Sequence, residues 1–271
     1  MSVILAVLLA LNAAPGRRAD LGVEGARLYV PDGYIPVPDG AVNVLLHLHG
    51  APSVVEPAFV AAGWSGVLVT FNRKGLSSVY ETPFADPTLF PKLLDATLAA
   101  LHDMKRADGL KVGRVVVSSF SAGFGGVRAV LKVPEHRARI NGLVMLDSLY
   151  AGYAGDPAFK NVDPAKVADF RRFAVEAAAG RNWFLLTHSA QVPPGYASTT
   201  ETADDLIRAL GGASRPTSFD WKNGWIQTRT FEKGRFVVLG FDGVGPDDHL
   251  AHLRRVAEVW KRARMLDKAD P

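Results

Sequence analysis

Six short apolar runs recur along the chain, and they constrain the fold more than any other feature. Each is five to eight residues long and almost continuously apolar, which is typical of strands that are covered on both faces of a sheet. Between them, apolar side chains recur at helical spacing over 89–104, 167–177 and 250–263. Strands that alternate with helices predict an α/β fold with a mainly parallel sheet and helices on both faces. The runs cover 42–48, 66–71, 113–120, 140–146, 183–187 and 236–241.

Two further segments predict the edge of this sheet. Segments 26–30 and 34–37 flank a Pro-Asp-Gly turn signal and are therefore expected to form an antiparallel edge hairpin. The two long loops over 72–87 and 189–202 are expected to build a site, because active-site residues concentrate in loops on a rigid scaffold.

Chain length and composition favour one globular domain. The chain has 271 residues, and no repeat or composition shift divides it, so we expect a single domain over 15–271. The formal net charge is +4, without a long block of like charge, and this gives no reason to expect a nucleic-acid partner. The chain has no cysteine, which excludes disulfides, thiolate metal sites and a cysteine nucleophile. The oligomeric state does not follow from these features.

The first fourteen residues, MSVILAVLLALNAA, form an apolar segment that ends in small residues. The segment is too short to span a bilayer as a helix, so stable membrane insertion is not expected. It resembles the apolar core and cleavage region of a secretory signal peptide, although no positive charge precedes it. Residues 1–14 therefore predict export to the periplasm or the exterior. The alternative is a buried first element of a cytoplasmic domain.

The most informative stretch is VVVSSFSAGFGG over 115–126, where an apolar strand runs into small residues. The glycines do not fit a dinucleotide or phosphate-binding loop, because residue 128 is Arg and no Gly-Lys-Ser/Thr follows. The stretch resembles the nucleophile elbow of the α/β-hydrolases, Gly-x-Ser-x-Gly, with Ser121 in the centre. Gly123 fits the motif, while Ser119 replaces its first glycine.

A His-Gly turn closes the first long apolar run at His49 and Gly50. It resembles the turn that supplies one backbone N–H to the oxyanion hole of many α/β-hydrolases. The resemblance implies donors at Ala51, with Gly50 as an alternative, and at Ala122 after the nucleophile. A competing interpretation makes His47 and His49 a metal pair, but no further ligand lies near them in sequence, so no metal site is expected.

In the α/β-hydrolases the histidine follows the acid in the chain. His249 lies after the last apolar run, at the start of the last helical pattern, and is the favoured base. His252 is its nearest competitor, since it lies three residues further on. His188 ends the fifth run and is expected to line the pocket, whereas His136 is expected on the surface.

The carboxylate that would orient His249 is harder to identify from the sequence. The fifth run ends without a carboxylate, but the fourth ends directly in Asp147, and some α/β-hydrolases place the acid there. Asp147 is therefore favoured, with a turn-capping role as the alternative. Asp242 remains a candidate close to His249. The carboxylates Glu201, Asp204 and Asp205 look like first-turn residues of a helix.

Several other residues are expected near the substrate. His49, His188 and two residues of the loop after the second run, Asn72 and Tyr80, are the predicted substrate-binding residues. Arg73 and Lys74 in the same loop are equally well explained as solvated. Tyr196, Trp221 and Trp225 add aromatic surface that fits a core as well as a pocket. No stretch after Asp147 is long enough for a lid domain, so an open pocket is expected.

Together these motifs resemble an esterase-like serine hydrolase of the α/β-hydrolase fold. The resemblance implies a Ser121–His249–Asp147 triad and an acyl-enzyme, acting on a small or polymer-derived ester without a cofactor. The same machinery would serve an amidase, a peptidase or an acyltransferase. A binding protein without catalysis remains the alternative of another class, because the fold alone does not fix function.

Overall fold

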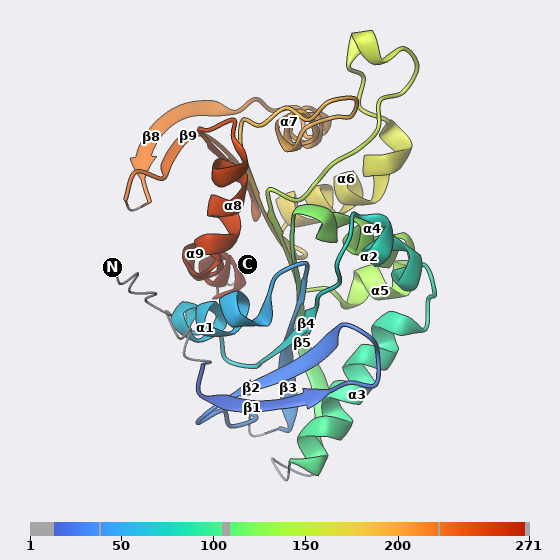
Figure 1. Ribbon diagram of the computed structural model, residues 1–271. Helices are drawn as coiled ribbons and strands as arrows, with labels where there is room; N and C mark the ends of the chain where they lie inside the picture. Colours follow the sequence, from blue (N-terminus) through green and yellow to red (C-terminus); the bar gives the residue numbers. More distant parts are fainter. Residues whose placement is uncertain (1–13, 38, 105–108, 222, 269–271) are drawn as a thin grey trace, which may run out of the picture.

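One sheet organises the computed structural model, which describes residues 14–37, 39–104, 109–221 and 223–268 (Figure 1). Its described strands lie in the order β1-β2-β4-β3-β5-β6-β7-β10-β9-β8. The six from β4 to β10 are parallel, and an antiparallel pair flanks them at each edge. The predicted single-domain α/β fold is therefore confirmed. The strands are β1 Gly16–Asp20, β2 Ala26–Pro31, β3 Ala41–Leu48, β4 Val67–Phe71, β5 Lys111–Phe120, β6 Gly142–Leu146, β7 Trp183–His188, β8 Arg215–Asp220, β9 Ile226–Lys233 and β10 Phe236–Phe241.

Helices cover both faces of the sheet (Figure 1). Helices α1 and α9 pack together on one face, and the longer series from α2 to α7 covers the other. Helix α8 leads directly into α9. The described helices are α1 Pro52–Ala62, α2 Ser78–Phe84, α3 Leu89–Asp103, α4 Phe124–Lys132, α5 Pro134–Arg139, α6 Pro164–Ala178, α7 Thr199–Ala209, α8 Pro246–Arg254 and α9 Val256–Lys268, with short 3₁₀ turns η1 Ser121–Gly123 and η2 Pro157–Phe159.

The continuous apolar runs are explained by two cores, one on each face. In β7, Phe184 belongs to the core under α6, while Trp183 and Leu185 belong to the core under α9. Successive side chains of a strand point to opposite faces, so a strand buried on both faces must be apolar at every position.

The edge of the sheet differs from the expectation. The 34–37 segment forms no strand, and β2 instead pairs antiparallel with β1, whose sequence GRRAD gave no apolar signal. Edge strands can be polar because one side faces solvent, and charged side chains protect such edges. Arg18 of β1 also pairs with the buried Glu56 of α1. The polar edge strand β8 escaped prediction for the same reason, and β9, which pairs with it, escaped because its apolar and polar residues are mixed.

The strand order reverses between β3 and β5. The chain passes from β3 to β4 on one side, then returns across β3 to β5 and continues in the other direction. In open α/β sheets, ligands bind outside the carboxyl ends of the strands at such a switch point. His49 follows β3 and Ser121 follows β5, so both lie at this point.

The predicted signal segment falls on residues 1–13, which lie outside the described residues, and on the buried Ala14. Its cleavage and the export it implies remain predictions. Among the described helices, none has the length and apolar character needed to cross a bilayer.

The start of β6 leaves no room for a side chain. A Cβ at Gly142 would lie 1.9 Å from Cε2 of Trp183, whose ring is fully buried. We expect Gly142→Ala to lower the free energy of unfolding by about 2 kcal/mol or more, because overpacking displaces a buried ring. Urea denaturation measures the change. Gly152→Ala is the control, since no heavy atom lies within 4 Å of its Cβ position. Equal effects of the two variants would contradict the prediction.

Candidate active site

A cavity of about 500 Å³ opens at the carboxyl ends of the parallel strands, beside Ser121 and His249. Its volume falls in the range of small-molecule sites. The two long loops contribute to it as expected, through Leu76 and Ser77 after β4 and through Gln191, Pro193 and Tyr196 after β7. The remaining lining residues are Ala122, Phe124, Arg128, Tyr150, Ala151, Gly152 and Lys166.

Ser121 sits on a strained turn between β5 and α4. Its φ is +46°, a left-handed conformation that is uncommon for residues other than glycine. The turn brings the chain against the end of β3: a Cβ at Gly123 would lie 2.5 Å from the carbonyl oxygen of Leu48 and 3.0 Å from Cβ of Ser119. Glycine at 123 is therefore a steric requirement, while position 119 accommodates a serine.

The hydroxyl of Ser119 is hydrogen-bonded within the turn. Its Oγ lies 2.7 Å from Oγ of Ser148, and Ser148 Oγ–H donates to the carbonyl oxygen of Ser121 at 2.8 Å. Both serines are fully buried. Ser119, which departs from the usual glycine of the motif, thus supports the backbone of Ser121 through Ser148.

His249 joins Ser121 to Asp147. Its Nε2 lies 2.8 Å from Oγ of Ser121, and its Nδ1 lies 2.7 Å from Oδ2 of Asp147. An ionised carboxylate can only accept, so Nδ1 carries the hydrogen and Nε2 accepts from the serine hydroxyl. His249 is held from one side by the ring of Phe120, which stacks on it at 4.7 Å. The structure therefore brings together the three residues that the sequence placed on separate elements.

His252 has different partners. It is fully buried, and its Nδ1 bonds to the Thr187 hydroxyl at 2.8 Å. Burial lowers its pKa to about 4. The ring packs against Trp225 and Phe241, so this tryptophan belongs to the core.

Asp147 follows β6 with φ of +44° and is completely buried. Its Oδ1 accepts the backbone N–H of Ser189 at 2.9 Å and the Thr199 hydroxyl. Burial alone would raise the pKa of this carboxyl, but the nearby imidazoles of His252 and His249 and the hydrogen bonds outweigh it and hold the pKa well below its usual range. The side chain is thus a fixed carboxylate next to Nδ1 of His249.

The other acid candidates are engaged elsewhere. Glu201 closes the capping box of α7 with Ser198, as its first-turn position predicted. Asp204 pairs with Arg229, and Asp205 pairs with Arg171. Asp242 is exposed.

The His-Gly turn packs beside this group. His49 has φ of +65°, its Nδ1 lies 2.7 Å from the Tyr80 hydroxyl, and its ring stacks on Phe120 at 5.9 Å. The Tyr80 hydroxyl donates to the carbonyl of Arg73 at 2.6 Å, so Nδ1 of His49 carries the hydrogen. Burial lowers the pKa of His49, and the neighbouring His249 adds to this effect. The ring is therefore neutral at pH 7.

The two histidines of the turn do not converge. His47 is buried, its Nδ1 lies 3.0 Å from the Ser118 hydroxyl, and its ring packs edge-on against Trp260. His49 instead contacts Tyr80 and Phe120. The left-handed turn at His49 breaks the alternation of the strand, which explains why the two rings have different partners. No cluster of three metal-ligating side chains occurs among the described residues.

Solved structures share the fold of this chain, although the sequence comparisons found no match. No model of a known protein family matches the chain, and no curated protein sequence does. The carboxylesterase CesB (YbfK) from Bacillus subtilis superposes with a TM-score of 0.52 at 11% identity, over 97% of this chain and 95% of that one. The ferric enterobactin esterase (fes) from Salmonella typhimurium gives a TM-score of 0.50 at 9% identity, over 94% of this chain and 60% of that one. The chain has an α/β-hydrolase-like fold.

The predicted oxyanion donors stay predictions, since Ala122 lines the cavity but Ala51 and Gly50 do not. Ala122 lines the cavity directly after Ser121. Ala51 precedes Pro52 at the start of α1. Gly50 packs against the ring of His47, because a Cβ built on this glycine would lie 2.6 Å from Nε2 of the histidine.

The predicted substrate-binding residues do not line the cavity. Tyr80 and His188 are buried and lie outside the lining of the cavity, so their contact with a substrate stays a prediction. His188 instead bonds to Thr200 and Arg229. His49 and Asn72 are partly exposed outside the lining, and their contact with substrate stays a prediction.

Sequence reasoning missed the part of the wall that comes from α4, α6 and the segment after Asp147. Phe124 and Arg128 follow Ser121 by three and seven residues, a helical spacing that could have placed them beside it. Tyr150 and Lys166 come from the segment after Asp147, and only the folded chain brings them to this side.

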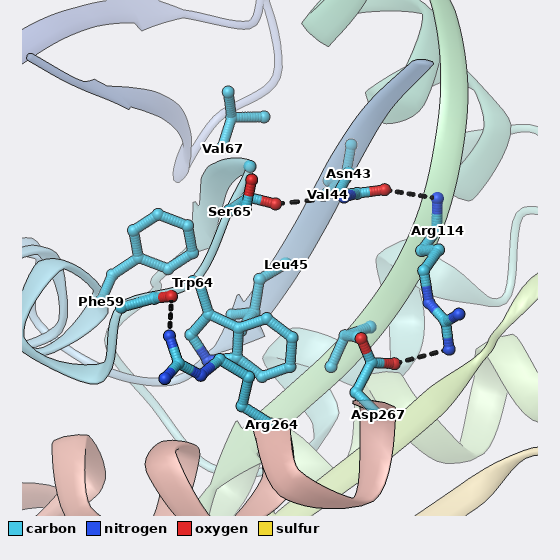
Figure 2. Close-up of a pocket in the computed structure, with 13 residues that line it drawn as sticks. Asn43, Val44, Leu45, Phe59, Trp64, Ser65, Val67, Arg114, Arg264 and Asp267 are labelled. Atoms are coloured by element: carbon cyan, nitrogen blue, oxygen red, sulfur yellow. Dashed lines mark hydrogen bonds and ion pairs between the residues drawn. The ribbon is translucent and has the colours of Figure 1, made fainter. Parts of the chain in front are cut away.

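A second cavity lies at the amino ends of β3, β4 and β5, opposite to the strand ends beside Ser121. Figure 2 shows the residues that line it. Its volume is about 130 Å³, which is below the range of ligand sites. The polar groups around it pair with one another: Arg114 with Asp267 at 2.7 Å, and Asn43 with the carbonyl of Ser65 at 3.1 Å. It is a packing gap between α1, α9 and the sheet, far from Ser121.

Removal of the Ser148 hydroxyl tests the support of the turn. We expect Ser148→Ala to lower the free energy of unfolding by about 1–3 kcal/mol, because the partly buried Ser121 carbonyl loses its donor. In a double-mutant cycle with Ser119→Ala, the combined loss should be smaller than the sum of the single losses, since the two hydroxyls act in one chain. Additive losses in urea denaturation would show that they act separately.

Three buried histidines predict a loss of stability in mild acid. Burial lowers the pKa of His47 and His188 to about 3 and that of His252 to about 4. The unfolded chain binds protons at these sites near pH 6.5 and the folded chain does not, so the free energy of unfolding falls as pH drops below about 6.5.

The variant His47→Gln isolates one of these sites. It should reduce the pH dependence of the free energy of unfolding by up to about 1.4 kcal/mol per pH unit between pH 6.5 and 5. Urea denaturation at several pH values measures this dependence. An unchanged dependence would mean that His47 is protonated alike in both states.

Proposed function

We propose that the protein is a serine hydrolase that cleaves carboxylic esters, with Ser121 as the nucleophile. The observation that carries this proposal is the continuous hydrogen-bonded path from Asp147 through His249 to Ser121, at the mouth of a cavity. A nucleophile bonded to a base, and a base bonded to an orienting acid, is the arrangement that activates a hydroxyl. The fold that the chain shares with a carboxylesterase supports the choice of an ester.

In the first half of the reaction, Ser121 Oγ attacks the carbonyl carbon of the ester while its proton passes to Nε2 of His249. Asp147 stabilises the imidazolium that forms and fixes the ring by its bond to Nδ1. The tetrahedral intermediate then collapses, and His249 gives the proton to the departing alcohol. An acyl-enzyme on Ser121 remains.

The negative charge on the tetrahedral oxygen needs donors that are already in place. The backbone N–H groups of Ala122 and Ala51 are proposed for this, with Gly50 as the alternative to Ala51. Both flank the switch point at which β3 and β5 end. Removal of one such donor costs about 3 kcal/mol of transition-state stabilisation in comparable hydrolases.

In the second half, a water molecule attacks the acyl carbon and gives its proton to Nε2 of His249. Ser121 leaves with that proton, and the carboxylic acid is released. The same groups would cleave an amide or pass the acyl group to another acceptor. A matched amide in the assay separates these cases.

The experiment combines covalent labelling with turnover. We expect a fluorophosphonate to label the intact protein and not Ser121→Ala, because only the activated hydroxyl attacks phosphorus. Hydrolysis of 4-nitrophenyl esters should fall at least 10³-fold in Ser121→Ala and by a similar order in Asp147→Asn, which leaves His249 without its orienting carboxylate.

The controls separate chemistry from folding. Ser53→Ala, at an exposed position of α1, should label and turn over as the parent chain does. Circular dichroism should show that every variant is folded. A folded parent chain that neither labels nor hydrolyses any ester would favour a binding protein and overturn the proposal.

A further inference from the structure

The charged side chains in the wall of the large cavity have one sign. Arg128 from α4 and Lys166 from α6 line it, and among the described lining residues there is no carboxylate. The other polar lining groups besides Ser121 and His249 are hydroxyls and one amide, from Ser77, Tyr150, Gln191 and Tyr196. Asp147 lies behind His249 and is fully buried. The wall is therefore rich in hydrogen-bond donors and positive charge.

A single carboxylate outside the wall, that of Glu81, neutralises part of this positive charge. Glu81 of α2 accepts from Arg128 at 2.6 and 3.2 Å, and Lys132 lies 3.8 Å from the same carboxylate. Burial raises the pKa of Glu81, but Arg128, Lys132 and Lys166 together outweigh it and lower that pKa. One carboxylate thus faces three cations, and Lys166 forms no ion pair with a carboxylate of the described residues.

One face of α4 contributes both an aromatic and a cationic residue to the wall. Phe124 and Arg128 are four residues apart and lie on one face of the helix, with the Arg128 guanidinium 5.1 Å from the Phe124 ring. Arg128 follows Ser121 by seven residues, which corresponds to about 10 Å along a helix. Next to Ser121 the wall is aromatic, since Phe124, Tyr150 and Tyr196 contact one another in a row at 5.6 and 5.7 Å.

We propose that this cavity binds an ester whose apolar part ends in an anionic group, which Arg128 and Lys166 hold while Ser121 attacks the ester carbonyl. The aromatic row contacts the apolar part of such a substrate, and the two cations take its far end. A carboxylate is the simplest group of this kind, since a guanidinium and an ammonium both bind it by charge-assisted hydrogen bonds. The inference rests on the proposed function, because it names the substrate class of the same site.

Two pairs of esters test the inference from both sides of the scissile bond. On the acyl side, the 4-nitrophenyl hemiester of suberic acid is compared with 4-nitrophenyl nonanoate, which has a similar length and a methyl end. On the alcohol side, 8-acetoxyoctanoate is compared with nonyl acetate. We expect the charged member to have at least a tenfold higher kcat/KM in one pair. The preference should shrink in 0.5 M NaCl, because salt screens charges.

Variants at Lys166 connect this preference to the wall. Lys166→Gln should lower the charged-to-neutral ratio of kcat/KM at least threefold, and Lys166→Glu should lower it further. Lys166→Arg should retain it. Lys92→Gln is the matched control, because Lys92 is exposed on α3 outside the cavity, and its ratio should equal that of the parent chain.

The outcomes separate the two proposals. Equal or faster hydrolysis of the neutral ester in both pairs would overturn the inference and leave the ester hydrolase standing. A ratio that Lys166→Gln and Lys166→Glu do not change would also overturn it. Hydrolysis of none of the four esters by the folded protein, without fluorophosphonate labelling, would instead overturn the proposed function.

Discussion

The parallel pairing of β5 with β3 and β6 is the constraint on which the rest of the site depends. It aligns Ser119 with Leu48 and Phe120 with Leu146, so the residues that follow, Ser121 and Asp147, emerge side by side. A slip by one residue would turn every side chain of β5 to the opposite face. The two buried cores oppose such a slip, because it would exchange the apolar sets of both faces.

Local strain is concentrated at the strand ends that the pairing aligns. His49, Ser121 and Asp147 all have positive φ, and each is the first residue after its strand. Such conformations cost of the order of 1–3 kcal/mol each and persist where the surroundings enforce them. The surroundings here are the Tyr80 hydroxyl beside His49, the Ser148 hydroxyl on the Ser121 carbonyl and the Thr199 hydroxyl on Asp147. The turns are thus held by buried hydroxyl groups from neighbouring elements.

The features that could be predicted from the sequence are those that depend on a pattern of neighbouring residues. The apolar runs located six strands, and the small residues around Ser121 located the turn, because both signals lie within a few neighbouring residues. Asp147 and His249 could be placed next to Ser121 through the resemblance to the α/β-hydrolases, in which the acid and then the histidine follow the nucleophile in the chain.

Features that depend on packing between distant segments escaped prediction. Tyr80 and His188 look like site residues in the sequence, but burial is decided by the elements that close over them. The role of Ser119 depends on Ser148, which lies 29 residues away. The strands β1 and β8 are outermost and polar, so they lack the apolar pattern that reveals inner strands.

Those outermost strands also affect how the sheet meets other chains. An open edge presents unpaired backbone groups that can template a strand from another molecule. At one end, β1 carries the exposed Arg17, and at the other end β8 carries Pro216, which has no N–H to donate. Both ends therefore resist growth of the sheet by strand addition. A second molecule that approaches this protein meets charge at one margin and a missing donor at the other, so self-association through continuous β-structure is disfavoured.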